Sequence, residues 1–204
     1  VRHGKNLEER YIGNANIFSE KEKKHLLKKK AKRKNTDVTA PFFNRVKEKD
    51  KVTKMQYLDM HLWLVHDILL KADKMSMAHS LETRVPFLDK NVWEVAAKLP
   101  TNYKVEGKVT KKALREAAKK RIPEKVASKK KLGFPVPIRV WLREDAYYNR
   151  VKEVLTGETA KKFFCTDFLV KLMEQHRAGT YDNSRKIWTV YVFLLWYREY
   201  FEIR

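Results

Sequence analysis

The segment Lys71–Asp89, KADKMSMAHSLETRVPFLD, constrains the fold of this chain more than any other part of the sequence. It sets charged side chains among apolar ones, and buried charges are costly unless they are paired or face a ligand. Pro86 disfavours helical geometry at Val85, which predicts an extended conformation over residues 84–88. Asp89 is a typical N-cap residue for a following helix. The segment therefore predicts a pinned connection that leads into a helix.

Helical periodicity dominates the rest of the chain, and no stretch of useful length alternates with period two. Ser19 with Glu22, and Thr53 with Gln56, match the capping-box pattern at the start of two helices. Apolar residues on the second of these recur at helical spacing and are expected to face a core: Met55, Leu58, Leu62, Val65 and Leu69. Helices are expected over 41–49, 53–71, 89–98, 110–122, 145–155, 167–178 and from 183 or 184 onward, with a loop over 101–109. The sequence predicts a mainly α fold.

Length and composition favour one folded domain of 204 residues, with 43% hydrophobic and 12% aromatic residues. The single Cys165 excludes an internal disulfide and is typical of a reducing, cytoplasmic environment. The apolar run Ile187–Tyr197 falls short of the roughly 18 residues that a membrane span needs. It predicts a core helix, and no membrane association is expected.

The formal net charge of +21 raises the alternative of a basic helical module that binds nucleic acid. Its phosphate contacts would come from Lys28–Lys34 and Lys129–Lys131. The run Lys28–Lys34 has no interleaved aromatic residue, and its cations also suit a solvated helix end, where they complement the helix dipole. We favour the solvated helix end, and the role of the run in function stays open.

Metal and nucleotide motifs are absent from the sequence. The six histidines fall in no ligand spacing, and one cysteine cannot build a structural zinc site. No P-loop, GxGxxG or GxSxG string occurs. The sequence therefore predicts no metal site and no self-contained nucleotide site.

A cationic and stiffened segment spans residues 128–137. It holds three lysines, Gly133, Pro135 and Pro137 in ten residues. The prolines restrict their neighbours, and Gly133 permits close backbone approach to a ligand. Such a segment suits a phosphate group, because its charge is held in place before the anion arrives. On composition alone, a surface connection rich in lysine is the favoured explanation.

Three motifs together resemble the asparagine synthetase family. From Asp73 to Asp89 the chain matches the signature D-(K/R)-x-(S/T)-M-A-x-x-L-E-x-R-x-P-F-L-D position for position. Lys129–Pro135, followed by Trp141, resembles the family's K-x-G-F segment. The strings at 11–14 and 17–19 resemble the region after the family's pyrophosphate loop. The nucleophilic cysteine of the glutaminase domain and the S-G-G-x-D-S loop of the ATP site do not occur here, so we expect the C-terminal piece of a longer synthetase.

The resemblance implies the helical C-terminal portion of an adenine-nucleotide α-hydrolase-like (ATP pyrophosphatase) domain, without the parallel sheet. All of 1–204 would belong to it, with a basic connecting segment and short helices over 1–52. A helical core that carries the signature at 71–89 would follow over 53–204. A homodimer is left open.

The implied activity is that of an ATP-dependent, AMP-forming amide ligase. Aspartate, ATP and ammonia from glutamine would be its substrates, and β-aspartyl-AMP its intermediate. ATP and Mg²⁺ would be bound mainly by the missing N-terminal part, which holds the glutaminase and the ATP loop, so the chain alone is expected to be inactive. A relative that forms a β-lactam or cyclises a peptide is the alternative within the family.

The resemblance also implies roles for particular residues. Aligned on Phe134, Lys131 corresponds to the lysine that contacts pyrophosphate. Asp67 resembles the acidic residue shortly before the signature, at a spacing one residue longer, and Lys71 one turn later can reach it. An ordinary surface ion pair is the alternative for these two. The signature residues expected to be structural are Asp73, Glu82, Arg84 and Asp89, with Glu82 and Arg84 tying the segment after them to neighbouring helices.

Overall fold

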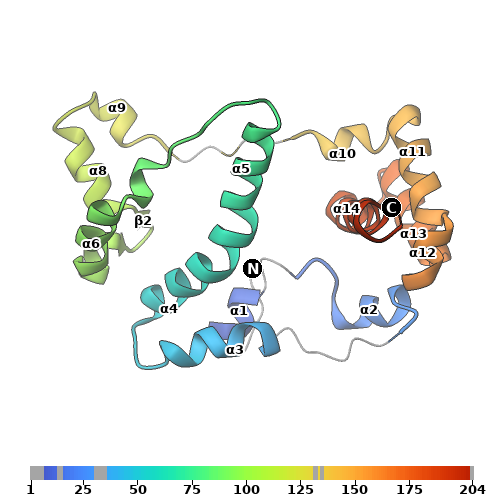
Figure 1. Ribbon diagram of the computed structural model, residues 1–204, viewed down its shortest axis with the longest axis horizontal. Coiled ribbons are helices and arrows are strands. Elements are labelled where there is room, and N and C mark those ends of the chain that lie inside the picture. The colour runs from blue at the N-terminus through green and yellow to red at the C-terminus, as the bar shows by residue number, and fades with distance from the viewer. Residues whose placement is uncertain (1–6, 13–15, 30–35, 131–132, 134–135, 203–204) are drawn as a thin grey trace. The chain divides into compact units, whose positions relative to one another are not determined.

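The computed structural model describes residues 7–12, 16–29, 36–130, 133 and 136–202 (Figure 1). The described chain is mainly helical, as predicted, and divides into two compact units. Unit 1 comprises residues 1–3, 12–34 and 133–204, and unit 2 comprises residues 4–11 and 35–132. Segments far apart in the sequence therefore meet within unit 1.

Unit 1 is a helical bundle built around a continuous hydrophobic core. Its helices are α2 (Glu20–Leu26), α10 (Ile138–Trp141), α11 (Asp145–Thr156), α12 (Glu158–Phe163), α13 (Thr166–Arg177) and α14 (Ser184–Phe201). The long helices α11, α13 and α14 pack against one another, and α2 packs on α13. Fully buried Leu155, Leu169 and Leu194 come from these three long helices. The core helix that the sequence predicted at 187–197 is thus confirmed within α14.

The N-terminal part of unit 1 is fastened to this bundle by backbone and side chains. The capping box of Ser19 and Glu22 opens α2, as predicted. Lys28 N–H donates to the carbonyl of Phe163 at 2.9 Å, and Cys165 N–H donates to the carbonyl of Leu26 at 2.8 Å. Lys28 and Lys29 are exposed after the end of α2, and the rest of the basic run at 30–34 lies outside the described residues.

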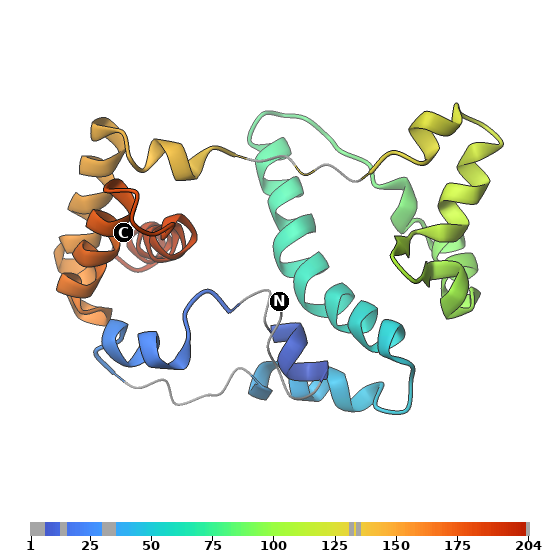
Figure 2. The ribbon, with the colours of Figure 1, turned by 180° about the vertical axis from the view of Figure 1, so that it is seen from behind.

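Unit 2 contains α3 (Thr36–Arg45), one long helix and several short elements. The long helix comprises α4 (Lys51–Leu58), the π-helical η1 (Asp59–Leu69) and α5 (Leu70–Met77), which follow one another without a break (Figure 2). The other elements are α1 (Leu7–Ile12), η2 (Pro86–Leu88), α6 (Lys90–Lys98), α7 (Thr101–Lys104), β1 (Val105–Glu106), β2 (Val109–Thr110), α8 (Lys112–Lys119) and α9 (Glu124–Ala127). Of α1, residues 7–11 belong to unit 2. The described part of unit 2 buries few hydrophobic residues: Val46, Leu58 and Ala127.

Two predictions about the long helix are wrong. It starts at Lys51 because Asp50 caps it, accepting the N–H groups of Val52 at 3.0 Å and Thr53 at 3.1 Å, so Thr53 is not the N-cap. Of the five apolar residues expected to face a core, only Leu58 is buried, and Val65 is 49% exposed. Helical periodicity identifies an apolar face but not the partner that covers it.

The chain after Lys98 corrects two more predictions. The expected loop at 101–109 forms α7 and a small antiparallel hairpin in which Val105 pairs with Thr110. Gly107, with φ +58°, takes the first position of its two-residue turn, which is a known hairpin preference. Thr110 belongs to the second strand, and α8 begins after Lys111, which adopts a left-handed conformation.

Candidate functional site

The first predicted pair lies on the long helix of unit 2. The Lys71 ammonium is 3.9 Å from the Asp67 carboxylate, and both side chains are more than half exposed. The other oxygen of Asp67 accepts the indole N–H of Trp63 at 2.8 Å. Both bonds join residues four apart in sequence. The structure therefore brings Asp67 and Lys71 together, and it adds Trp63, which the sequence analysis did not single out.

A second polar contact orders the start of the π-helix. Burial and the neighbouring carboxylate of Asp59, which accepts the Tyr11 hydroxyl, together raise the pKa of Tyr11 well above its usual range. Both groups lie in unit 2. Tyr11 therefore stays protonated at neutral pH and serves as a hydrogen-bond donor to Asp59.

The signature turns sharply at the end of α5. Ser80 adopts φ +55°, a left-handed conformation that is uncommon for a residue with a side chain. The next N–H, of Leu81, donates to the carbonyl of Ser76 at 2.9 Å. Asp73 lies in the first turn of α5, where its backbone carbonyl accepts the Ser76 hydroxyl at 3.1 Å.

The structure alters the predicted conformation of the segment that follows. Residues 81–85 have no regular structure, and Pro86–Leu88 forms a 3₁₀ turn, so the extended conformation expected over residues 84–88 is wrong at least from Pro86 onward. Leu88 N–H donates to the carbonyl of Val85 at 2.8 Å, which closes this turn. Asp89 then caps α6 as predicted, accepting the N–H of Asn91 at 2.9 Å.

Glu82 and Arg84 pair with each other. Their side chains meet at 2.8 Å and are 68% and 81% exposed. The structure shows no tie from this pair to a neighbouring helix among the described residues of unit 2.

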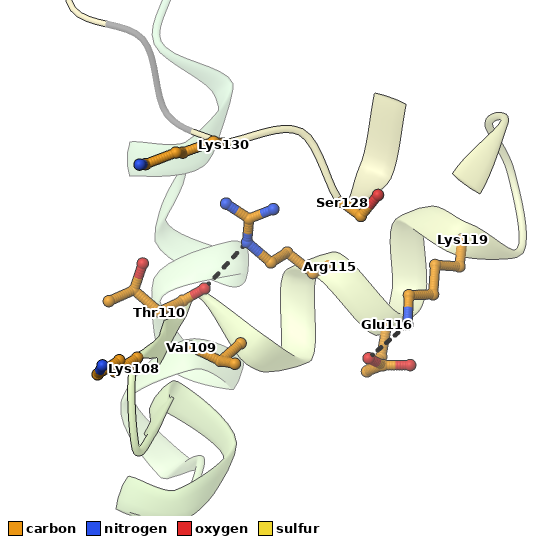
Figure 3. A pocket seen from close by; sticks show the side chains of 8 residues that line it. All are labelled: Lys108, Val109, Thr110, Arg115, Glu116, Lys119, Ser128 and Lys130. Atoms are coloured by element: carbon orange, nitrogen blue, oxygen red, sulfur yellow. Dashed lines mark hydrogen bonds and ion pairs between the residues drawn. The ribbon is translucent and has the colours of Figure 1, made fainter. Parts of the chain in front are cut away.

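A shallow, cationic pocket of about 530 Å³ lies beside the hairpin and α8 (Figure 3). Its charged lining residues are basic except for Glu116, which pairs with Lys119 at 3.0 Å. The lining residues are Lys108, Val109, Thr110, Arg115, Glu116, Lys119, Ser128 and Lys130. The pocket thus ends at the segment in which the sequence predicted a phosphate contact.

Arg115 joins the two sides of this pocket through backbone carbonyls. Its Nε donates to the carbonyl of Thr110 at 3.1 Å, and one terminal nitrogen donates to the carbonyls of Ala127 at 3.0 Å and Lys129 at 3.1 Å. For this part of the chain the sequence predicted only a basic helix. Nothing in the helical pattern distinguishes this arginine from its exposed basic neighbours.

The lysine-rich segment is described in part. Lys129 and Lys130 are exposed, and Lys131, the predicted pyrophosphate contact, lies outside the described residues. A Cβ at Gly133 would meet no atom within 4 Å, so this glycine is not required by packing inside its unit. The placement of Lys131 relative to Asp67 is therefore not tested.

No three His, Cys, Asp or Glu side chains among the described residues are grouped so as to hold a metal ion. Among the described helices, none is both long and apolar enough to cross a bilayer.

The comparisons with known proteins agree with the motifs. Residues 2–198 match the family model described as asparagine synthase. The chain is 47% identical over 192 residues to asparagine synthetase [glutamine-hydrolyzing] 1 of Bacillus subtilis, a match that covers 94% of this chain and 30% of that protein. It is 41% identical over 197 residues to a putative asparagine synthetase [glutamine-hydrolyzing] of Mycobacterium bovis, covering 96% and 30% respectively.

The chain thus spans about 30% of the length of these relatives. No solved structure matches it. The match to the family model covers nearly the whole chain and contains all three sequence motifs. This chain belongs to the asparagine synthase family.

Proposed function

We propose that this chain is a C-terminal helical part of the synthetase region of a glutamine-hydrolysing asparagine synthetase. The observation that carries the proposal is the 47% identity to a protein of that name over 94% of this chain. An adenine-nucleotide α-hydrolase-like domain would be completed by the remaining part of the protein. That part would also supply the ATP loop and the glutaminase.

In the proposed reaction, the side-chain carboxylate of aspartate attacks the α-phosphate of ATP. The bond from the α-phosphate to the bridging oxygen breaks, and pyrophosphate leaves, so β-aspartyl-AMP forms. Ammonia from glutamine then attacks the acyl carbon, AMP leaves, and asparagine is released. The chemistry consists mainly of placing the reactants and offsetting the negative charge on the leaving groups.

Within this chain, Lys131 is the proposed contact for the leaving pyrophosphate. Its support is the match of Lys129–Pro135 to the K-x-G-F segment and the lysine-rich surroundings. Asp67 and Lys71 are proposed as catalytic residues near the signature, a carboxylate paired with an ammonium group. Their contact on the long helix supports this pairing. Their exposure in this chain leaves both groups accessible to a ligand.

Mg²⁺ is the cofactor that the proposed reaction implies, and it would share the charge on the phosphates. The described residues do not fit a metal site, since no three potential ligands are grouped. No step is therefore assigned to a metal held by this chain. ATP and Mg²⁺ would be bound mainly by the rest of the protein, and the 204-residue chain alone is expected to form no asparagine.

The proposal is tested in the complete synthetase by replacing each lysine of the segment in turn. We expect Lys131→Ala to lower both kcat and kcat/KM for adenylation by about 10² to 10³, because a preorganised cation acts where charge develops. Aspartate-dependent exchange of pyrophosphate into ATP measures this step. Binding of aspartate itself should change little.

Lys129→Ala and Lys130→Ala are the charge-matched controls, since each removes one positive charge from the same segment. Equal and small losses of exchange activity in all three variants would mean that the segment contributes only to the overall positive electrostatic field of the protein. Exchange that depends on another acid instead of aspartate would identify a β-lactam-forming or peptide-cyclising relative. The nucleic-acid-binding alternative is not favoured by the comparisons.

A further inference from the structure

Arg115 makes an unusual set of contacts for a surface arginine. Its three acceptors are all backbone carbonyls: one lies on the second strand of the hairpin, one on the last residue of α9, and one on Lys129 just after α9. Among the described residues, no carboxylate forms an ion pair with it, and neighbouring Glu116 pairs with Lys119 instead. Figure 3 shows its guanidinium directed toward the chain between Ser128 and Lys130.

The two carbonyls that Arg115 holds belong to Ala127, the last residue of α9, and to Lys129 two residues later. On one side, Ser128 is tied to α9, because its hydroxyl donates to the carbonyl of Glu124 at 2.7 Å. The N–H of Lys129 donates to the carbonyl of Val126 at 3.2 Å. Beyond this point, the next residues of the chain are Lys130 and Lys131. Arg115 is therefore the contact that joins the start of the lysine-rich segment to the hairpin and α8.

Only arginine suits these contacts. A guanidinium presents five N–H donors in a fixed planar arrangement, so one side chain can reach several carbonyls at once. A lysine ammonium keeps the charge but has a flexible stem and no planar fork. The guanidinium of Arg115 thus holds backbone carbonyls together, and these hydrogen bonds do not depend on the net charge of the pocket.

We propose that Arg115 is a positioning residue, a guanidinium clamp that fixes the backbone at Ala127 and Lys129 and thereby aims the lysine-rich segment. This inference rests on the proposed role of Lys131 in adenylation. Arg115 acts through that lysine and does not touch substrate. A small misplacement of a charge-neutralising group, by about 1 Å, can cost about 10² in rate.

The test uses Arg115→Lys in the complete synthetase, with Lys108→Ala as a control that removes a pocket charge without touching the clamp. We expect Arg115→Lys to lower kcat of pyrophosphate exchange about 100-fold, with KM for aspartate unchanged. The melting temperature should stay near that of the parent protein. A purely structural weakening would lower the melting temperature without this separation of kcat from KM.

A second measurement detects loss of the Arg115 clamp without relying on the activity of the enzyme. Trypsin cleaves after lysine, and three lysines stand at 129–131. In Arg115→Lys, cleavage there should be about tenfold faster or more, the change expected when one charge-assisted hydrogen bond is lost and cleavage follows the open population. Mass spectrometry of the fragments locates the cut. Lys108→Ala should cleave at the parent rate.

A double variant separates this inference from the proposed function. If Arg115 acts through Lys131, Arg115→Lys should add no further loss of exchange in a Lys131→Ala background. Exchange that is intact in Arg115→Lys but lost in Lys131→Ala overturns the inference and leaves the proposed function standing. Intact exchange in Lys131→Ala overturns the proposed role of Lys131 in adenylation, and the rate of tryptic cleavage then decides the clamp by itself.

Discussion

The two units bury their apolar residues very differently. In unit 1, α11 alone buries Tyr148, Val151 and Leu155, and its partners α13 and α14 bury as many or more. In unit 2, the three consecutive helical pieces from Lys51 to Met77 bury only Leu58 in the described chain. Unit 1 is therefore stabilised by its own core, whereas the described part of unit 2 is held mainly by local contacts.

This difference concerns the signature directly. Met75, Leu81 and Phe87 are 62%, 61% and 67% exposed, although the sequence around them has the apolar content of a buried segment. Large contiguous apolar surfaces are uncommon on isolated soluble domains. Because the chain spans about 30% of its relatives, we propose that the remaining part of the synthetase covers this surface.

The largest effect on stability is expected in the core of unit 1. Leu194→Ala removes a fully buried side chain from α14 and should lower the stability of unit 1 by about 3 kcal/mol, through lost burial and the cavity left behind. Hydrogen exchange of peptides from α11 and α13 during denaturant titration measures it. Protection in unit 2 should not change.

Leu81→Ala is the matched control in unit 2, since it removes the same atoms from an exposed position. We expect a change within about 0.5 kcal/mol in this chain. Equal losses for the two leucines would contradict the contrast between the units.

The sequence predicted those parts of the fold that depend on local chemistry. Ser19 caps α2 and Asp89 caps α6, each as expected from its position. Thr53 was placed at a helix start because its capping-box pattern matched, but Asp50 three residues earlier accepts two N–H groups and begins the helix first. Two competing capping signals so close together cannot be ranked from the pattern alone.

The candidate site was predictable only where neighbours in sequence meet. The contact of Asp67 with Lys71 follows from their spacing of four residues, and it is confirmed. The clamp joins Arg115 to carbonyls 12 and 14 residues away, and no side-chain pattern encodes a backbone acceptor. The burial expected for Val65 failed for a related reason, because periodicity identifies an apolar face but not the partner that covers it.

A smaller effect is expected at the N-cap of the long helix. Asp50 accepts hydrogen bonds from the Thr53 hydroxyl, the backbone N–H groups of Thr53 and Val52, and the Thr101 hydroxyl. Together these lower its pKa to about 2, against the opposing effect of burial. Asp50→Ala should cost about 1 kcal/mol of stability in unit 2, as loss of an N-cap does. Because the carboxylate is exposed, solvent screens its interactions, so they stabilise the protein less than the lowered pKa of Asp50 alone would indicate.

The pH dependence of this cap has a definite sign. Because the pKa is lower in the folded state, the stabilisation is present above about pH 4, the ordinary pKa of aspartate, and is lost as pH falls toward 2. Asp50→Asn is the control, since asparagine caps about as well but does not titrate here. Helicity of the chain followed by circular dichroism against pH should show this loss in the parent and not in Asp50→Asn.

The smallest effect in this chain is expected at Arg84, and it tests whether the signature lacks a partner here. Its pair with Glu82 is exposed, so Arg84→Ala should change stability by no more than about 0.5 kcal/mol. In the complete synthetase the same change should cost about 3 kcal/mol if the covering part buries the pair, because one charge would be left unpaired. Denaturant titration of both proteins gives the comparison, with Lys90→Ala as an exposed cation on α6 for control. A loss above about 1 kcal/mol in the 204-residue chain would show that unit 2 already buries Arg84 in solution. Equal, negligible losses in both proteins would show that the signature stays exposed after assembly, and Arg84 would then be free to meet a ligand.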